Sequence, residues 1–152
     1  MKNKLALSDW ANVAEVVGGL AVVISLLYVG VQINENTEEV RATSRQQLVT
    51  RSADATGNAA SNPELATALG KAEQGTSFAP EELWQYQYFV RGMFYDIQEA
   101  YLLYTEGHLD RDYWLTRKSI FQAYVVNPLA LEVYMRDRKL GILHKEFAAA
   151  SL

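Results

Sequence analysis

The chain has 152 residues, no cysteine and a formal net charge of −4. The lack of cysteine excludes disulfides, thiol catalysis and cysteine-bound metal clusters, and the acidic balance without a basic block argues against nucleic acid as a partner. The length suffices for one membrane helix and one small soluble domain, but not for two domains.

Residues 1–12 form a short N-terminal flank in which Ser8 or Asp9 is expected to cap the start of a long helix. Lys2 and Lys4, placed before an apolar run, also fit a cleavable secretion signal. That alternative is weaker, because the apolar run is long and ends in YVGVQINENT, whereas a cleavage site would have small residues there. We therefore expect the helix to stay in the mature protein.

Residues 13–33, VAEVVGGLAVVISLLYVGVQI, are predicted to form a transmembrane helix. These residues, at about 1.5 Å each, give a helix of roughly 31 Å, which matches a hydrocarbon core of about 30 Å. Twelve of them are Val, Ile or Leu, which outweigh the cost of Glu15, an acid near one end of the stretch. Trp10 and Tyr28 lie toward opposite ends, where aromatic rings prefer the membrane interface. A buried helix of a soluble protein is the weaker alternative.

Small side chains recur along one face of this helix at alternating spacings of three and four. Together with an adjacent glutamate they are predicted to form a helix–helix interface, made of Ala11, Ala14, Glu15, Gly18, Ala21 and Ser25. Lipid gives little hydrophobic drive for association, so membrane helices rely on the close backbone packing and polar contacts that such a stripe permits. The alternative is that the small residues form no interface, since such residues are common in membrane-spanning helices, and that Glu15 only marks the edge of the membrane. The opposite face would then meet lipid through Leu20, Val23, Leu27 and Val31.

Residues 34–57 are polar helix formers and are predicted to form a helical stalk. Large apolar residues are sparse in this segment and occur at Val40, Leu48 and Val49. Because so thin a stripe buries little by itself, the stalk must pack against a neighbouring chain or the downstream domain. The segment GNAASNP, residues 57–63, is expected to break the helix.

Residues 58–152 are predicted to form an aromatic-rich domain of antiparallel helices. Start and stop signals, chiefly Asn-Pro pairs, Asp110 and the glycines at 75, 107 and 141, place helices over 63–74, 80–106, 111–126 and 128–140. A last short helix is expected to return Ile142, Leu143 and Phe147 to the core. The 80–106 helix should bury the positions that recur at three and four, namely Leu83, Tyr86, Val90, Met93, Ile97, Tyr101 and Tyr104. No segment alternates as a strand does, so the fold class is all-α.

Thirteen of the seventeen aromatic residues lie between Phe78 and Tyr124. They could form a stacking platform or a cofactor pocket. We favour a helical core, because the rings follow helical spacing and a domain of this size needs their burial. No cofactor is predicted.

Catalytic and metal-binding patterns are weak, so no catalytic, cofactor or metal residues are predicted. Neither His108 nor His144 stands in an E-x-x-H or H-x-x-x-H spacing, which would place two ligands on one helical face. Asp96 and Glu99 are three residues apart and could share a site, but Glu99 projects away from the Ile97 face, which favours a solvated surface acid. The Gly18–Gly19 pair lacks the context of a nucleotide-binding loop.

Several stretches together resemble a broad group of uncharacterised bacterial single-pass membrane proteins of about this length. They are VVGGLAVVISLLYVGVQINENT, NPELATAL, YLLYTEGHLDRDYW and NPLALEVYMRDR. The resemblance implies an inner-membrane protein with one N-terminal span, a helical domain and no catalytic residues to carry over. Basic residues are nearly balanced across the span, with Lys2 and Lys4 before it and Arg41 and Arg45 after it. The resemblance therefore decides the orientation and implies a cytoplasmic C-terminal domain.

These features favour a non-catalytic, membrane-anchored assembly protein, either self-associating or an accessory subunit of a larger membrane complex. Its expected partners are membrane lipids and further protein chains, without nucleic acid. One alternative is a membrane-tethered binding or sensor module for a lipophilic ligand or a protein partner. An enzyme with an unrecognised site is the third.

Overall fold

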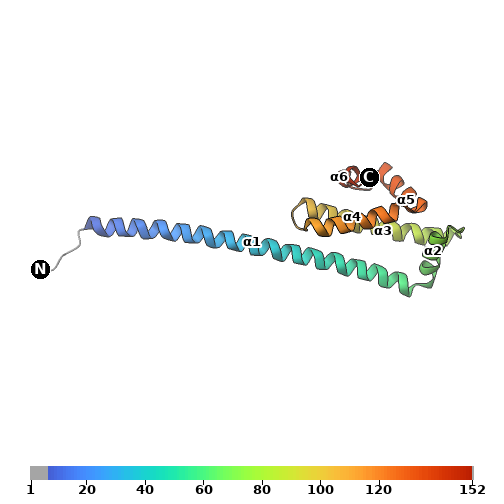
Figure 1. Ribbon diagram of the computed structural model, residues 1–152, viewed down its shortest axis with the longest axis horizontal. Coiled ribbons are helices and arrows are strands. Elements are labelled where there is room, and N and C mark those ends of the chain that lie inside the picture. Colours follow the sequence, from blue (N-terminus) through green and yellow to red (C-terminus); the bar gives the residue numbers. More distant parts are fainter. Residues whose placement is uncertain (1–6, 152) are drawn as a thin grey trace. The chain divides into compact units, whose positions relative to one another are not determined.

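The computed structural model describes residues 7–151, within which every regular element is an α-helix and no strand occurs (Figure 1). The chain divides into two compact units, residues 1–40 and 41–152. Residues 1–6, including Lys2 and Lys4 of the expected flank, lie outside the described part. The all-α fold class is confirmed for residues 7–151.

Helix α1 spans Leu7–Ser61 and belongs to both units. It begins before Ser8 and Asp9, so neither residue is its N-cap. The expected break at 57–63 is shorter than the sequence indicated: the helix continues through Gly57 and ends at Ser61. Asn62 then starts the next helix, which leaves one residue between the two.

The second unit continues with α2 (Pro63–Gln74), α3 (Pro80–Thr105), α4 (Arg111–Val125), α5 (Pro128–Lys139) and α6 (Lys145–Ala150). These bounds agree with the predicted helices to within one or two residues. Helix α3 contacts α2, α4, α5 and α6 and is the central helix of this unit. Gly75 ends α2 in the left-handed region with φ 65°, where a side chain would be strained.

The four largest fully buried side chains of the second unit are aromatic rings. The predicted aromatic core is confirmed only in part, because Trp84, Tyr88 and Tyr95 are exposed. Phe94, Phe121 and Tyr134 pack with ring centroids 5.1–5.6 Å apart, and Phe147 packs on Phe121 at 5.8 Å. All four rings are buried. Offset and edge-to-face contacts at these distances add to the free energy of burial.

Two details of the predicted core are wrong. Of the positions predicted for the buried face of α3, only Tyr86, Val90 and Ile97 are buried, and Phe94 and Ala100 complete that face. The other four are only partly buried, namely Leu83, Met93, Tyr101 and Tyr104. Ile142 is 44% exposed and precedes α6, whereas Leu143 and Phe147 are buried as expected.

Residues 41–61 of α1 belong to the second unit and pack on its other helices through one thin stripe. Leu48 and Ser44 are buried in it. Arg41 donates to the Gly107 carbonyl at 3.0 Å, and Arg45 lies 3.5 Å from Asp110. Along this stripe, residues 41–61 of α1 contact downstream helices of the same chain, and most of their other side chains are exposed.

Candidate functional site

The first candidate site is the small-residue stripe of α1. The structure places all of its members on one helix with exposed side chains. A Cβ built on Gly18 meets no atom within 4 Å, so this face has room for a closely packed partner. Ser25 donates its hydroxyl to the Ala21 carbonyl at 2.9 Å and is satisfied within the helix. Glu15 is exposed as well.

The apolar stretch around this stripe is not covered by the chain. Helix α1 is long and apolar enough to cross a membrane, and none of its most apolar window is buried. The face opposite the stripe is equally open, with Leu20, Val23, Leu27 and Val31 all more than half exposed. A signal sequence near the N-terminus shares this length and composition.

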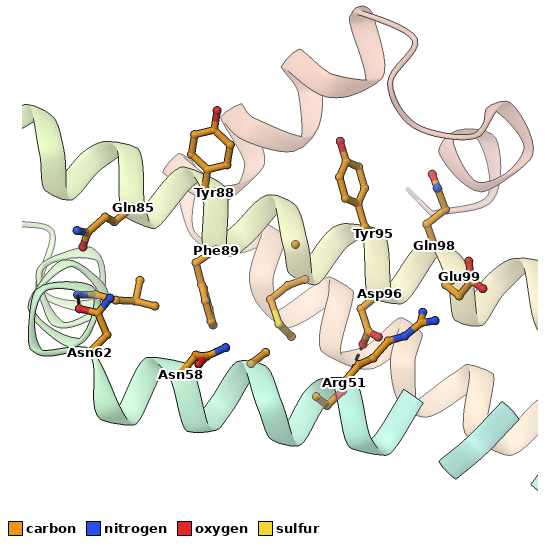
Figure 2. A pocket seen from close by; sticks show the side chains of 15 residues that line it. Arg51, Asn58, Asn62, Gln85, Tyr88, Phe89, Tyr95, Asp96, Gln98 and Glu99 are labelled. Carbon is orange, nitrogen blue, oxygen red and sulfur yellow. Dashed lines mark hydrogen bonds between the residues drawn. The ribbon is translucent and has the colours of Figure 1, made fainter. Parts of the chain in front are cut away.

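The second candidate site is a cavity of about 690 Å³ in the second unit, between the last turns of α1 and helix α3. Its volume lies within the range of small-molecule pockets, about 300–1,000 Å³. Figure 2 shows Phe89 and Asp96 pointing from α3 toward α1, whereas Tyr88 and Tyr95 point the other way. Ala55 and Gly92 also line the cavity, and neither carries a side chain beyond Cβ.

A buried polar network lies beside this cavity and shares Ser52 and Asp96 with its lining. Arg117 of α4 is 5% exposed and donates to the Leu48 carbonyl at 3.1 Å and to the Ser52 hydroxyl at 2.8 Å. It lies 3.3 Å from the Asp96 carboxylate, to which Ser52 also donates. Tyr113 supplies a further hydroxyl at 3.2 Å. The network joins α1, α3 and α4 through polar contacts inside the unit.

The structure corrects the prediction for Glu99, which is partly buried and lines the same cavity as Asp96 rather than being a fully solvated acid. The Asp96 side chain is 12% exposed and is paired with Arg117. Glu106 lies 3.5 Å from His108, both exposed and both outside the residues that line this cavity.

Sequence reasoning missed Arg117, Ser52 and Gln85. Arg117 stands three residues after Trp114 and four before Phe121, on the buried stripe of its helix. From this position in the sequence, the burial of Arg117 could have been predicted. No group of three or more acidic or histidine side chains that could hold a metal gathers within residues 7–151.

No protein-family model, curated protein or solved structure matches the chain.

Proposed function

We propose that the protein is a non-catalytic, membrane-anchored assembly protein. Residues 13–33 form a single transmembrane helix that continues into a polar stalk over residues 34–57. An antiparallel helical domain over residues 58–152 follows, on the cytoplasmic side of the inner membrane. The protein associates with itself, or with a larger membrane complex, through the stripe that contains Gly18.

The observation that carries this proposal is the exposure of the apolar part of α1. Soluble chains rarely leave contiguous apolar surface of this extent in water, and a core helix with this composition would be mostly buried. Here the most apolar window has no buried share at all. Lipid is the environment that covers such a surface on all sides, and the stripe is where a second helix fits.

The stripe is tested by Gly18→Leu, measured as the native mass of the full chain in a mild detergent. The larger side chain should push partner helices apart, so we expect a smaller particle than that of the wild type. Gly30→Leu is the matched control. It introduces the same side chain into the same apolar segment, off the stripe and with open space around it.

If Gly18→Leu leaves the particle mass unchanged, or if Gly30→Leu reduces it equally, the stripe is not the contact. A second protein that co-purifies with the wild type, and is lost with Gly18→Leu, identifies the accessory-subunit form of the proposal.

Glu15 is tested by two substitutions of similar size. Glu15→Gln keeps a hydrogen-bonding group and should preserve the assembly, whereas Glu15→Leu should weaken association by about 1 kcal/mol. The measurement is the dissociation constant of the assembly in detergent. Equal constants for all three proteins would mean that Glu15 does not contact a partner.

The second candidate function is a membrane-tethered binding or sensor module. The cavity between α1 and α3 favours it, because small-molecule sites are concave, mostly apolar and equipped with a few polar groups. A lipophilic compound that co-purifies with the wild type, and is absent from a cavity-filling variant such as Gly92→Leu, would support this function.

A further inference from the structure

Basic and apolar side chains are exposed together where α5 ends and α6 begins. Five exposed residues form this surface, which we call the α5–α6 patch: Arg138, Lys139, Leu140, Ile142 and Lys145. Leu140 is 66% exposed and Ile142 is 44% exposed. Single apolar residues are common on protein surfaces. Here, however, two of them lie between basic residues, and a partner that takes up both kinds of side chain would explain this combination.

The positive charge of the patch is not neutralised by other side chains of residues 7–151. None of its three basic side chains forms a hydrogen bond or an ion pair there. The adjacent acid, Asp137, is buried and accepts two hydrogen bonds from Arg91, so it does not offset the patch. Glu146 is exposed and offsets one charge. Three basic residues against this one acid leave a net charge of +2, in a chain whose net charge is −4.

Backbone contacts hold the segment that carries the patch. Gly141, just after α5, has φ 70°, in the left-handed region that often follows a helix end. The amide of Ile142 then donates to the Asp137 carbonyl at 3.0 Å. The amide of His144 donates to Gln98 of α3 at 2.6 Å. The segment is therefore attached to α5 at one end and to α3 at the other, while its apolar side chains stay on the surface.

The patch lies beside the C-terminal half of α3, where α1 also enters the second unit. Arg41, the first residue of this unit, donates to the Gly107 carbonyl just after α3. Gln98, which holds the patch segment, precedes Gly107 by nine residues, or about 14 Å along a helix. The other end of α5 lies elsewhere, since Asn127 there contacts Ala72 of α2. The patch is therefore on the half of the unit at which the chain arrives from the predicted span.

We propose that the α5–α6 patch docks the second unit on an anionic phospholipid bilayer. Its three basic side chains lie at the headgroups, and Leu140 and Ile142 insert between them. The negative surface potential attracts basic residues, and apolar side chains add affinity by leaving water. Nucleic acid would use the charges of the patch but not its apolar side chains.

This inference rests on the proposed function, which anchors the chain in the membrane and puts the second unit at the cytoplasmic leaflet, where anionic lipids lie. A free protein with three basic residues would bind such a surface weakly. The anchor, however, keeps the bilayer at a high effective concentration, so a small patch is sufficient for docking.

The test uses the full chain in vesicles of phosphatidylglycerol, which is anionic, or of phosphatidylcholine, which has no net charge. Because the chain has no cysteine, His144→Cys gives a single labelling position for a fluorophore and leaves every patch residue in place. Val126→Cys, at an 81% exposed site next to the other end of α5, is the matched control. Lipids with brominated acyl chains quench a fluorophore that reaches the apolar layer of the bilayer.

The fluorophore at residue 144 should be quenched in phosphatidylglycerol and not in phosphatidylcholine. This quenching should disappear in about 1 M salt, which screens charges beyond about 3 Å. The fluorophore at residue 126 should be quenched in neither kind of vesicle, since α5 separates the two positions by about 18 Å.

Two substitutions in the chain labelled at residue 144 separate the charged from the apolar contribution. Lys139→Gln should lower the ratio of docked to free unit about fivefold, and Leu140→Ser should lower it about tenfold. Both side chains are exposed, so the fold should tolerate these changes. Val126→Ser, which removes an exposed apolar side chain outside the patch, should leave the ratio unchanged.

The proposal is overturned if residue 144 is not quenched in phosphatidylglycerol, if both lipids quench it equally, or if Leu140→Ser has no effect. A loss with Lys139→Gln but not with Leu140→Ser would indicate a general polyanion site, such as one for nucleic acid. Alkaline extraction of the same vesicles separates this failure from that of the proposed function. A chain that stays in the vesicles without quenching rejects only the docking, whereas a chain extracted from both lipids rejects the anchor itself.

Discussion

Arg117 and Asp137 are the buried charged side chains of the second unit, and each is stabilised by a different set of partners. Asp137 accepts two hydrogen bonds from Arg91, at 2.6 and 3.0 Å, which together raise the pKa of Arg91. Arg117 instead divides its donors among a backbone carbonyl, two hydroxyl groups and the Asp96 carboxylate. Loss of Arg117 would therefore leave several acceptors unpaired at once.

Replacing Arg117 by Met should lower the free energy of unfolding by about 3 kcal/mol, because it leaves Asp96 largely buried without its counter-charge. The additional change Asp96→Asn should then cost little, since the unpaired charge is gone. The measurement is urea unfolding of the two single variants and the double variant. Strict additivity would contradict an interaction between the two side chains.

Glu82 should make the unfolding free energy depend on pH in acid. Its side chain accepts hydrogen bonds from Lys71 Nζ at 2.7 Å and from the Ala79 amide at 2.7 Å, and these bonds lower the pKa of Glu82 in the folded state. A lowered folded-state pKa gives stability that is present above the unfolded pKa and lost as pH falls through the folded one.

The experiment compares acid unfolding of the wild type with that of Glu82→Gln, the neutral variant of similar size. The difference in stability should be present at pH 7 and shrink below about pH 4.5, the ordinary range of a glutamate pKa. A difference that stays constant down to pH 2 would show that ionisation of Glu82 does not contribute.

Helices α2, α4 and α5 of the second unit each begin at a capping side chain. Asn62 accepts from the amides of Glu64 and Leu65 at 3.0 and 3.1 Å, and Asn127 accepts from Leu129 and Ala130. Asn127 also donates its amide nitrogen to the Ala72 carbonyl at 3.1 Å, which ties the start of α5 to α2. It therefore acts both as a cap and as a link between helices.

Asn62→Ala should destabilise the protein by about 1 kcal/mol, the usual loss for a cap. Asn127→Ala should cost more, about 2 kcal/mol, since it also leaves the Ala72 carbonyl without this donor. Thermal unfolding of the two variants gives the comparison. Equal losses would mean that the bond to Ala72 contributes nothing.

Helix bounds could be predicted from the sequence because their signals are local. Asn62 with Pro63, Asn127 with Pro128, and Gly75 each act within a few residues of the helix end that they define. The cavity could not be predicted in this way. It depends on which face of α1 meets α3, which brings Ser52 against Asp96, 44 residues later in the chain.

Arg117 shows the same limit. Its position on the buried stripe of α4 could be predicted from the sequence. The Leu48 carbonyl that accepts its hydrogen bond could not, because it belongs to α1, far away in the chain. For the stripe around Gly18, the spacing indicates which residues share a face, but a partner has to be identified by experiment.

The whole molecule combines a second unit that buries its apolar groups with a first unit whose apolar stretch remains open. The second unit satisfies the ordinary rules of a soluble fold, with buried rings and capped helices. The first unit does not, since its Val, Leu and Ile side chains are exposed over the whole predicted span. Under the proposed function, water surrounds the second unit and lipid surrounds the apolar stretch of the first.

The central claim is that the apolar segment of α1 stays in the mature protein and lies in the membrane. The most direct measurement is the intact mass of the chain recovered from membranes after alkaline extraction, which releases peripheral proteins. We predict a chain of 17.1 kDa that contains residues 13–33 and remains in the membrane pellet. A shorter chain that begins after residue 33, or a full-length chain released into the supernatant, would contradict the account.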